Sequence, residues 1–206
     1  EPMAAAIGIR MPIKDAVGSM IIDVGGGTTD IAVISLSGIV KSKNIKIAGD
    51  RLNTDIITYM RDEFKILIGE TTAEAVKIAI SSVSPGEYME TSVRGRDLLT
   101  GLPREVVVTD ADIREAIALS VREFVDGVKD VLETTPPEIL SDIMHRGIML
   151  SGGGALLPGA KHQIPEGFVR NPHCFGSCGE VVDGNFKERP CIDPLTPPGQ
   201  KGLNYS

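Results

Sequence analysis

The sequence has no tryptophan, few other aromatic residues and no long apolar run. Phe, Trp and Tyr together make up 4% of the 206 residues, so we expect a core built mainly from Ile, Leu, Val and Met. No window approaches 18 consecutive apolar residues and no signal-peptide pattern is present, so we expect no direct membrane span. The net charge of −7 disfavours a broad electrostatic surface, and we therefore expect no nucleic-acid partner.

Cysteine is also scarce, and its three copies all lie in the C-terminal part of the chain. A body without thiols suits the cytosol. His173, Cys174, Cys178 and Cys191 could be metal ligands, but their spacing matches no compact zinc pattern. We favour an irregular tail over residues 160–206, because this stretch has no sustained helix or strand period and, with the proline just before it, holds seven of the 13 prolines.

What the sequence does have is a glycine motif in residues 20–34, MIIDVGGGTTDIAVI. β-Branched residues on both sides favour two strands, and glycines in the turn supply positive φ or close backbone approach. The uncovered N–H groups of three successive glycines can cradle a phosphate, the two threonines add hydroxyl donors, and the aspartate can hold Mg²⁺ through water. An ordinary glycine-rich hairpin is the alternative. The predicted phosphate and Mg²⁺ residues are Asp23, Gly25, Gly26, Gly27, Thr28 and Thr29.

A second glycine triplet lies in residues 146–157, RGIMLSGGGALL. A buried-strand run, three glycines and a helix start are the layout of a nucleotide site at the carboxyl edge of a sheet. One triplet is weak evidence, but two triplets that each leave a buried strand, with a helical insert between them, are stronger. The predicted nucleotide-binding residues here are Gly152, Gly153, Gly154 and Ala155.

The region between the triplets alternates strand and helix patterns. We expect a hairpin over 31–48 with its turn at 36–38, a helix over 50–66, strands within 87–108 and a short helical turn over 138–143. Thr71 or Thr72 is expected to cap one helix, and Thr109 a long amphipathic one with acidic residues in its first turn.

Glu74 and Lys77 are three residues apart and therefore share a helix face. A carboxylate and an ammonium on one face can hydrogen-bond the two hydroxyls of a ribose. By themselves, however, the two residues are better explained as a solvent-exposed ion pair, worth only about 0.3–0.5 kcal/mol.

Several longer motifs, with their spacings, resemble those of MreB, the bacterial actin-like family that sets rod shape. They are DVGGGTTDIAVIS, AGDRLN at 48–53, LIGETTAEAVK at 67–77, VRGRDLLTGLPREV at 93–106, TPPEILSDI at 135–143 and GIMLSGGGALL at 147–157. The resemblance runs from Glu1 to about Gly159. Sugar kinases, actins and heat-shock chaperone ATPases share the two glycine loops but not RGRDLLTGLP or PPEILSDI.

The resemblance implies an α/β chain with the actin-like ATPase (ribonuclease H-like) fold, mostly its second large lobe. Residues 1–19 would end the first lobe and form a connecting helix, and 20–159 would form the nucleotide-binding lobe with an inserted subdomain at about 50–145. Because the pattern is lost abruptly after Gly159, we hypothesise a shifted reading frame in residues 160–206.

The resemblance also implies ATP and Mg²⁺ as cofactors and specific roles for site residues. Glu1 would orient the water that attacks the γ-phosphate, although an N-terminal helix glutamate stabilised by the helix dipole is the alternative. The segment from Glu74 through Ala75 and Val76 to Lys77 would contact the sugar.

At the level of the cell, the resemblance implies an ATP-hydrolysing filament that self-assembles at the cytoplasmic face of the inner membrane. Its partners would be further copies of itself and the cell-wall elongation machinery. We expect the 206-residue chain to be inactive alone. A chaperone or sugar kinase of the same fold is the alternative function.

Overall fold

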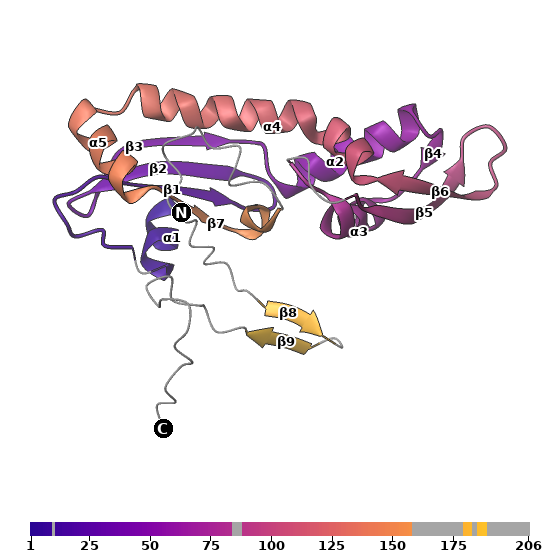
Figure 1. Ribbon diagram of the computed structural model, residues 1–206, viewed down its shortest axis with the longest axis horizontal. Coiled ribbons are helices and arrows are strands. Elements are labelled where there is room, and N and C mark those ends of the chain that lie inside the picture. Colours follow the sequence, from indigo (N-terminus) through magenta and orange to yellow (C-terminus); the bar gives the residue numbers. More distant parts are fainter. Residues whose placement is uncertain (10, 84–87, 158–178, 183–184, 189–206) are drawn as a thin grey trace. The chain divides into compact units, whose positions relative to one another are not determined.

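The computed structural model describes residues 1–9, 11–83, 88–157, 179–182 and 185–188 (Figure 1). The chain divides into two compact units, Glu1–Gly176 and Ser177–Ser206. In the second unit, β8 (Gly179–Val182) pairs antiparallel with β9 (Asn185–Glu188), within the stretch that the sequence predicts as irregular. The four possible metal ligands, His173, Cys174, Cys178 and Cys191, lie outside the described residues.

The first unit contains a four-stranded sheet of order β3-β2-β1-β7. Its strands are β1 (Ser19–Val24), β2 (Thr29–Ser35), β3 (Gly38–Ile45) and β7 (Ile148–Ser151). β1 pairs antiparallel with β2 and parallel with β7. As a result, the two glycine triplets, which follow the carboxyl ends of the parallel strands β1 and β7, lie at the same edge of the sheet.

The β2–β3 turn lies where the sequence predicts it, but glycine does not supply its positive φ angles. Leu36 has φ of 50° and Ser37 has φ of 60°, whereas Gly38 is already the first residue of β3. The backbone N–H groups of the two turn residues donate to the carbonyl oxygens of Asp15 and Ile13. These hydrogen bonds from a distant segment help to hold a conformation that side chains disfavour.

Both faces of this sheet are covered, with side chains alternating between them. On one face, residues such as Met20 and Ile22 contact α4 (Asp110–Glu133) and α5 (Pro137–Arg146). On the other face, Ile21 packs in a cluster with Ala6 of α1 (Pro2–Gly8). Figure 1 shows α4 along one side of the sheet and α1 on the other. The continuous apolar run of β1 is explained by this double burial.

A second hydrophobic cluster is built on a three-stranded sheet of order β4-β5-β6. Its elements are α2 (Gly49–Asp62), β4 (Ile66–Leu67), α3 (Glu70–Ile80), β5 (Glu90–Asp97) and β6 (Pro103–Thr109). α2 contributes Ile56 and Met60, which are completely buried. The predicted helix over 50–66 and the strand pair within 87–108 are therefore present, with shifted ends.

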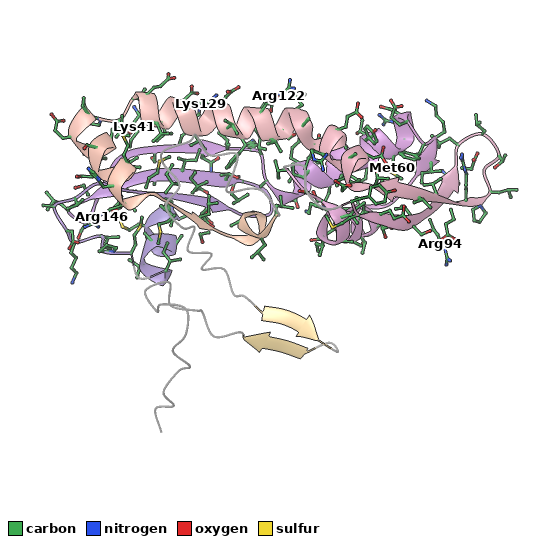
Figure 2. All side chains as sticks on the ribbon, in the orientation of Figure 1. Lys41, Met60, Arg94, Arg122, Lys129 and Arg146 are labelled. Atoms are coloured by element: carbon green, nitrogen blue, oxygen red, sulfur yellow. The ribbon has the colours of Figure 1, made fainter. Side chains whose placement is uncertain are left out.

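Helix α4 takes part in both clusters. Ile113 and Ile117 pack in the second cluster, and Val128 and Val131 pack in the first. Figure 2 shows Arg122 and Lys129 on the side of α4 that faces away from the first sheet. Among the described residues, no helix combines the length and apolar character that crossing a bilayer requires.

Helix ends confirm one predicted cap and contradict another. The Thr109 hydroxyl accepts from the Asp112 N–H, and the Asp112 carboxylate accepts from the Thr109 N–H, which is a complete capping box. The prediction of a Thr71 or Thr72 cap is wrong, because α3 already begins at Glu70 with Gly69 as its N-cap and no side-chain cap. The predicted short turn over 138–143 is the ten-residue helix α5.

Candidate functional site

A pocket of about 430 Å³ lies between the two glycine loops and the helices α2 and α3. This volume is within the usual range for small-molecule sites. It is lined by Gly25, Gly26, Gly49, Asp50, Leu52, Glu74, Lys77, Ile78, Gly153, Gly154, Leu156 and Leu157. Six of these residues, four glycines with Glu74 and Lys77, are predicted site residues, so the structure brings together side chains and loops that are far apart in the sequence.

The first glycine loop connects β1 to β2 and rests on the N-terminus of α2. The Gly49 N–H donates to the Gly25 carbonyl at 3.2 Å, and the Asp50 N–H donates to the Gly26 carbonyl at 2.8 Å. The sequence suggested positive φ or close backbone approach as the reason for these glycines, but no glycine of this triplet has a positive φ. Loop and helix meet through main-chain atoms. Only at Gly25 would a Cβ be tightly placed, 3.2 Å from the Thr28 carbonyl oxygen of the same loop, whereas Cβ atoms at Gly26 and Gly27 would make ordinary contacts.

The second glycine loop differs, because here one glycine is required by its conformation. Gly152 has φ of 84°, and a Cβ at this position would overlap the Val24 carbonyl oxygen. A Cβ at Gly154 would overlap the Val24 side chain, whereas one at Gly153 would meet nothing within 4 Å. Where the sequence predicts the start of a helix, the described residues form a single 3₁₀ turn, η1 (Gly153–Leu156). The two loops therefore touch at Val24, the last residue of β1.

Asp23 lies at this junction. In the sheet it is paired with Asp30 on one side and Ser151 on the other, and its Oδ1 would be 2.8 Å from a Cβ at Gly152. The described residues contain no cluster of three or more His, Cys, Asp or Glu side chains for a metal. A single half-buried carboxylate nevertheless fits Mg²⁺, which keeps several waters and takes phosphate oxygens as its other ligands.

The two threonines after the first triplet have different environments. Thr29 is completely buried and its hydroxyl donates to the Ile47 carbonyl at 2.6 Å, so its proton is directed into the protein. Thr28 is half-exposed. Of the pair, Thr28 is the better placed to offer a hydroxyl to a ligand.

The other predicted site residues are not in the lining of this pocket; they are Glu1, Asp23, Gly27, Thr28, Thr29, Ala75, Val76, Gly152 and Ala155. Val76 and Ala155 are buried in hydrophobic clusters, and Ala75 is exposed. Glu1 is the exposed N-cap of α1, with its carbonyl accepting from the Ala4 and Ala5 N–H groups. Glu1 is therefore not part of this pocket wall, and its role in orienting the attacking water stays a prediction.

Lys77 is the cation of the pocket wall. Its Nζ donates to the Gly49 carbonyl at 3.1 Å. Burial lowers the pKa of Lys77, while the neighbouring carboxylates of Glu74 and Asp50 act in the opposite direction. Glu74 and Lys77 thus interact through their charges, whereas the hydrogen bond of the Lys77 ammonium goes to the backbone of α2.

Sequence reasoning missed the contributions of Gly49, Asp50, Ile78 and Leu156. Asp50 is in the first turn of α2, and its carboxylate would be 3.7–3.8 Å from Cβ atoms at Gly26 and Gly27. Ile78 and Leu156 are 75% and 54% exposed, and they give the pocket apolar surface. The AGDRLN motif, a helix start directly after a hairpin, was the available signal for the first two residues.

Two glycine loops at one edge of a sheet, with Asp23 between them and α3 with its charged residues opposite, are the arrangement expected of an α/β protein of the actin-like class. The sequence model of the family described as MreB/Mbl protein matches residues 1–170. The chain belongs to this family.

Individual relatives agree. The chain is 48% identical over 167 residues to the cell shape-determining protein Mbl of Bacillus subtilis, covering 81% of the chain and 50% of Mbl. It is 50% identical over 158 residues to MreB of Escherichia coli K12, covering 76% of the chain and 46% of MreB. The chain thus spans about half the length of these relatives.

Solved structures support the same fold. MreB5 of Spiroplasma citri bound to AMPPNP has a TM-score of 0.75 and 40% identity, covering 79% of this chain and 51% of that one. A MamK double helical filament has a TM-score of 0.63 at 22% identity, covering 83% and 54%, and shows the fold alone. The chain therefore has the actin-like ATPase fold.

Proposed function

We propose that the described residues form most of the second lobe of a cell shape-determining MreB/Mbl protein and line one side of its ATP site. The observation that carries this proposal is the pocket in which both glycine triplets meet Glu74 and Lys77. The AMPPNP-bound S. citri MreB5 supports the choice of an adenine nucleotide.

In this site, the loop N–H groups and the Thr28 hydroxyl bind the phosphates, and Glu74 and Lys77 face the sugar. Asp23 holds Mg²⁺ through water, and the metal supplies neutralisation of the phosphate charge. Glu1 orients the attacking water from the first lobe. The apolar surface of Ile78 and Leu156 suits the face of a base.

The assembled protein forms filaments at the cytoplasmic face of the inner membrane and guides the cell-wall elongation machinery. The MamK filament supports self-assembly as a property of this fold. ATP binding and hydrolysis then control the contacts between subunits of the filament, because the nucleotide lies between the two lobes of each subunit.

The test is to express the full reading frame that contains these residues, as wild type and as Gly26→Val. A Cβ at Gly26 would have no neighbour closer than 3.8 Å, so the variant is expected to fold, but a branched side chain would cover the phosphate loop. We expect wild type to bind ATP and to pellet as filaments, and the variant to do neither. ADP release that depends on a small substrate, without pelleting, would overturn the proposal in favour of a kinase.

A further inference from the structure

We propose that Lys77 is a positioning residue that fixes the direction of the phosphate-binding N–H groups through the N-terminus of α2. Three contacts carry this proposal. The Lys77 Nζ donates to the Gly49 carbonyl, the Gly49 N–H donates to the Gly25 carbonyl, and the Asp50 N–H donates to the Gly26 carbonyl. We call this set, Lys77, Gly49, Asp50, Gly25 and Gly26, the Lys77 latch.

The latch joins elements of the two hydrophobic clusters. The glycine loop continues β1 of the first sheet, whereas Lys77 and the first turn of α2 belong to helices that pack in the second cluster. The ammonium, the helix start and the loop are closely packed around Gly49, because a Cβ there would be in van der Waals contact with the Lys77 Nζ at 3.4 Å and the Gly26 carbonyl oxygen at 3.6 Å.

Because the peptide unit is planar and trans, a latch that holds the loop carbonyls also fixes the direction of the N–H groups that follow them. In each peptide unit the C=O and the following N–H point in opposite directions. With the Gly25 and Gly26 carbonyls held toward α2, the N–H groups of Gly26 and Gly27 are directed away from α2. These two N–H groups are among the proposed phosphate donors, so a loosened latch would let the loop peptides rotate and lose their common direction.

The charges around the lysine agree with this role. The carboxylates of Glu74 and Asp50 both favour its cationic form, and a cationic donor makes a stronger hydrogen bond to a carbonyl than a neutral one. A lysine has three donor hydrogens, so the bond to Gly49 leaves donors for a sugar. A positioning role and a sugar-contact role of Lys77 therefore predict different nucleotide affinities when the 2′-hydroxyl of the sugar is removed.

The first experiment needs no nucleotide and uses the 206-residue chain. Amide hydrogen exchange is measured by NMR for wild type, Lys77→Met, Lys77→Arg and the control Glu74→Gln. The described hydrogen bonds between the loop and the start of α2 do not involve the Glu74 side chain. We expect Lys77→Met to speed exchange of the Gly49 and Asp50 amides by about tenfold, with the α2 amide of Met60 unchanged. Lys77→Arg, which keeps a cationic donor, and Glu74→Gln should stay near wild type. Unchanged exchange at Gly49 and Asp50 in Lys77→Met would overturn the latch.

The second experiment rests on the proposed function and uses the protein of the full reading frame. Affinities for ATP and 2′-deoxyATP are compared in wild type and Lys77→Met. A positioning role weakens the binding of both nucleotides, and any sugar contact of Lys77 adds to the loss for ATP. A loss confined to ATP, with 2′-deoxyATP bound as by wild type, would show that Lys77 acts through the sugar alone and would overturn the proposal. If wild type binds neither nucleotide, the proposed function fails, and the exchange measurement still decides the latch.

Discussion

Single residues of the two glycine triplets have different environments. Gly152 needs its positive φ and the absence of a side chain against Val24, whereas Gly25 and Gly26 accept hydrogen bonds from the N-terminus of α2 through their carbonyls. Gly153 is in open space beside the pocket. Substitutions in one motif are therefore expected to affect stability and ligand binding separately.

We expect Gly152→Ala to lower the free energy of unfolding of the 206-residue chain by about 2 kcal/mol or more, because it adds left-handed strain and a clash with the Val24 carbonyl. Gly153→Ala is the matched control and should change stability by less than about 0.5 kcal/mol. Urea unfolding followed by circular dichroism measures both. Equal effects of the two substitutions would contradict the described loop.

The two threonines offer a second comparison at this scale. Thr29→Val should lower the free energy of unfolding by about 1–3 kcal/mol, because the half-buried Ile47 carbonyl loses the donor supplied by the completely buried Thr29. Thr28→Val should leave stability nearly unchanged and instead weaken ATP binding by the protein of the full reading frame. Calorimetry with ATP and urea unfolding separate the two effects. If Thr28→Val binds ATP as wild type does, Thr28 is no phosphate ligand.

Glu1 is predicted to act on the attacking water. Glu1→Ala in the protein of the full reading frame should slow ATP hydrolysis by about two or more orders of magnitude and leave ATP affinity nearly intact. Phosphate release under saturating ATP is the measurement, and calorimetry is the control. An unchanged turnover number would remove Glu1 from the mechanism and leave it as the N-cap of α1.

Among the elements, α4 connects the structure, because its first half packs in the second cluster and its second half in the first. Its start is defined by the reciprocal hydrogen bonds of Thr109 and Asp112. The sequence was enough to predict this start, since a cap involves residues only three positions apart. α3 lacks such a side-chain cap, so its first residue depends on packing instead.

We expect Thr109→Ala to lower the free energy of unfolding by about 1 kcal/mol, the usual cost of losing an N-cap. Asp112→Ala should have a similar effect, and the double variant should lose less than the sum, because each residue contributes to the same reciprocal pair. Thr58→Ala, at an exposed position within α2, serves as the control. Additive losses in urea unfolding would show that the two residues do not act as one cap.

At the scale of the whole molecule, the chain covers half of B. subtilis Mbl. The described pocket has the two glycine loops and the helices α2 and α3 as its walls. Each charge-assisted hydrogen bond to phosphate is worth about 1.5–3 kcal/mol. Two or three fewer such bonds than in the protein of the full reading frame would weaken ATP binding at least about a hundredfold.

We therefore expect the 206-residue chain to bind ATP at least about a hundredfold more weakly than the protein of the full reading frame and to form no filaments. Titration of a fluorescent ATP analogue with Mg²⁺ tests the affinity of both proteins, and electron microscopy tests assembly. Micromolar affinity of the chain, or filaments, would show that these residues are a competent module by themselves.

Residue patterns were enough to predict the strands of the first sheet, the amphipathic helix α4 with its cap, the two glycine loops and the Glu74–Lys77 helix face. These features depend on residues close together in the chain, through side-chain period, local capping and backbone freedom. Three features could be seen only in the folded chain: the Thr29 hydroxyl donates to Ile47, Gly152 alone of the two triplets has positive φ, and Lys77 donates to Gly49 of another helix. Each of these depends on a partner brought close by folding, and no local pattern specifies which partner that is.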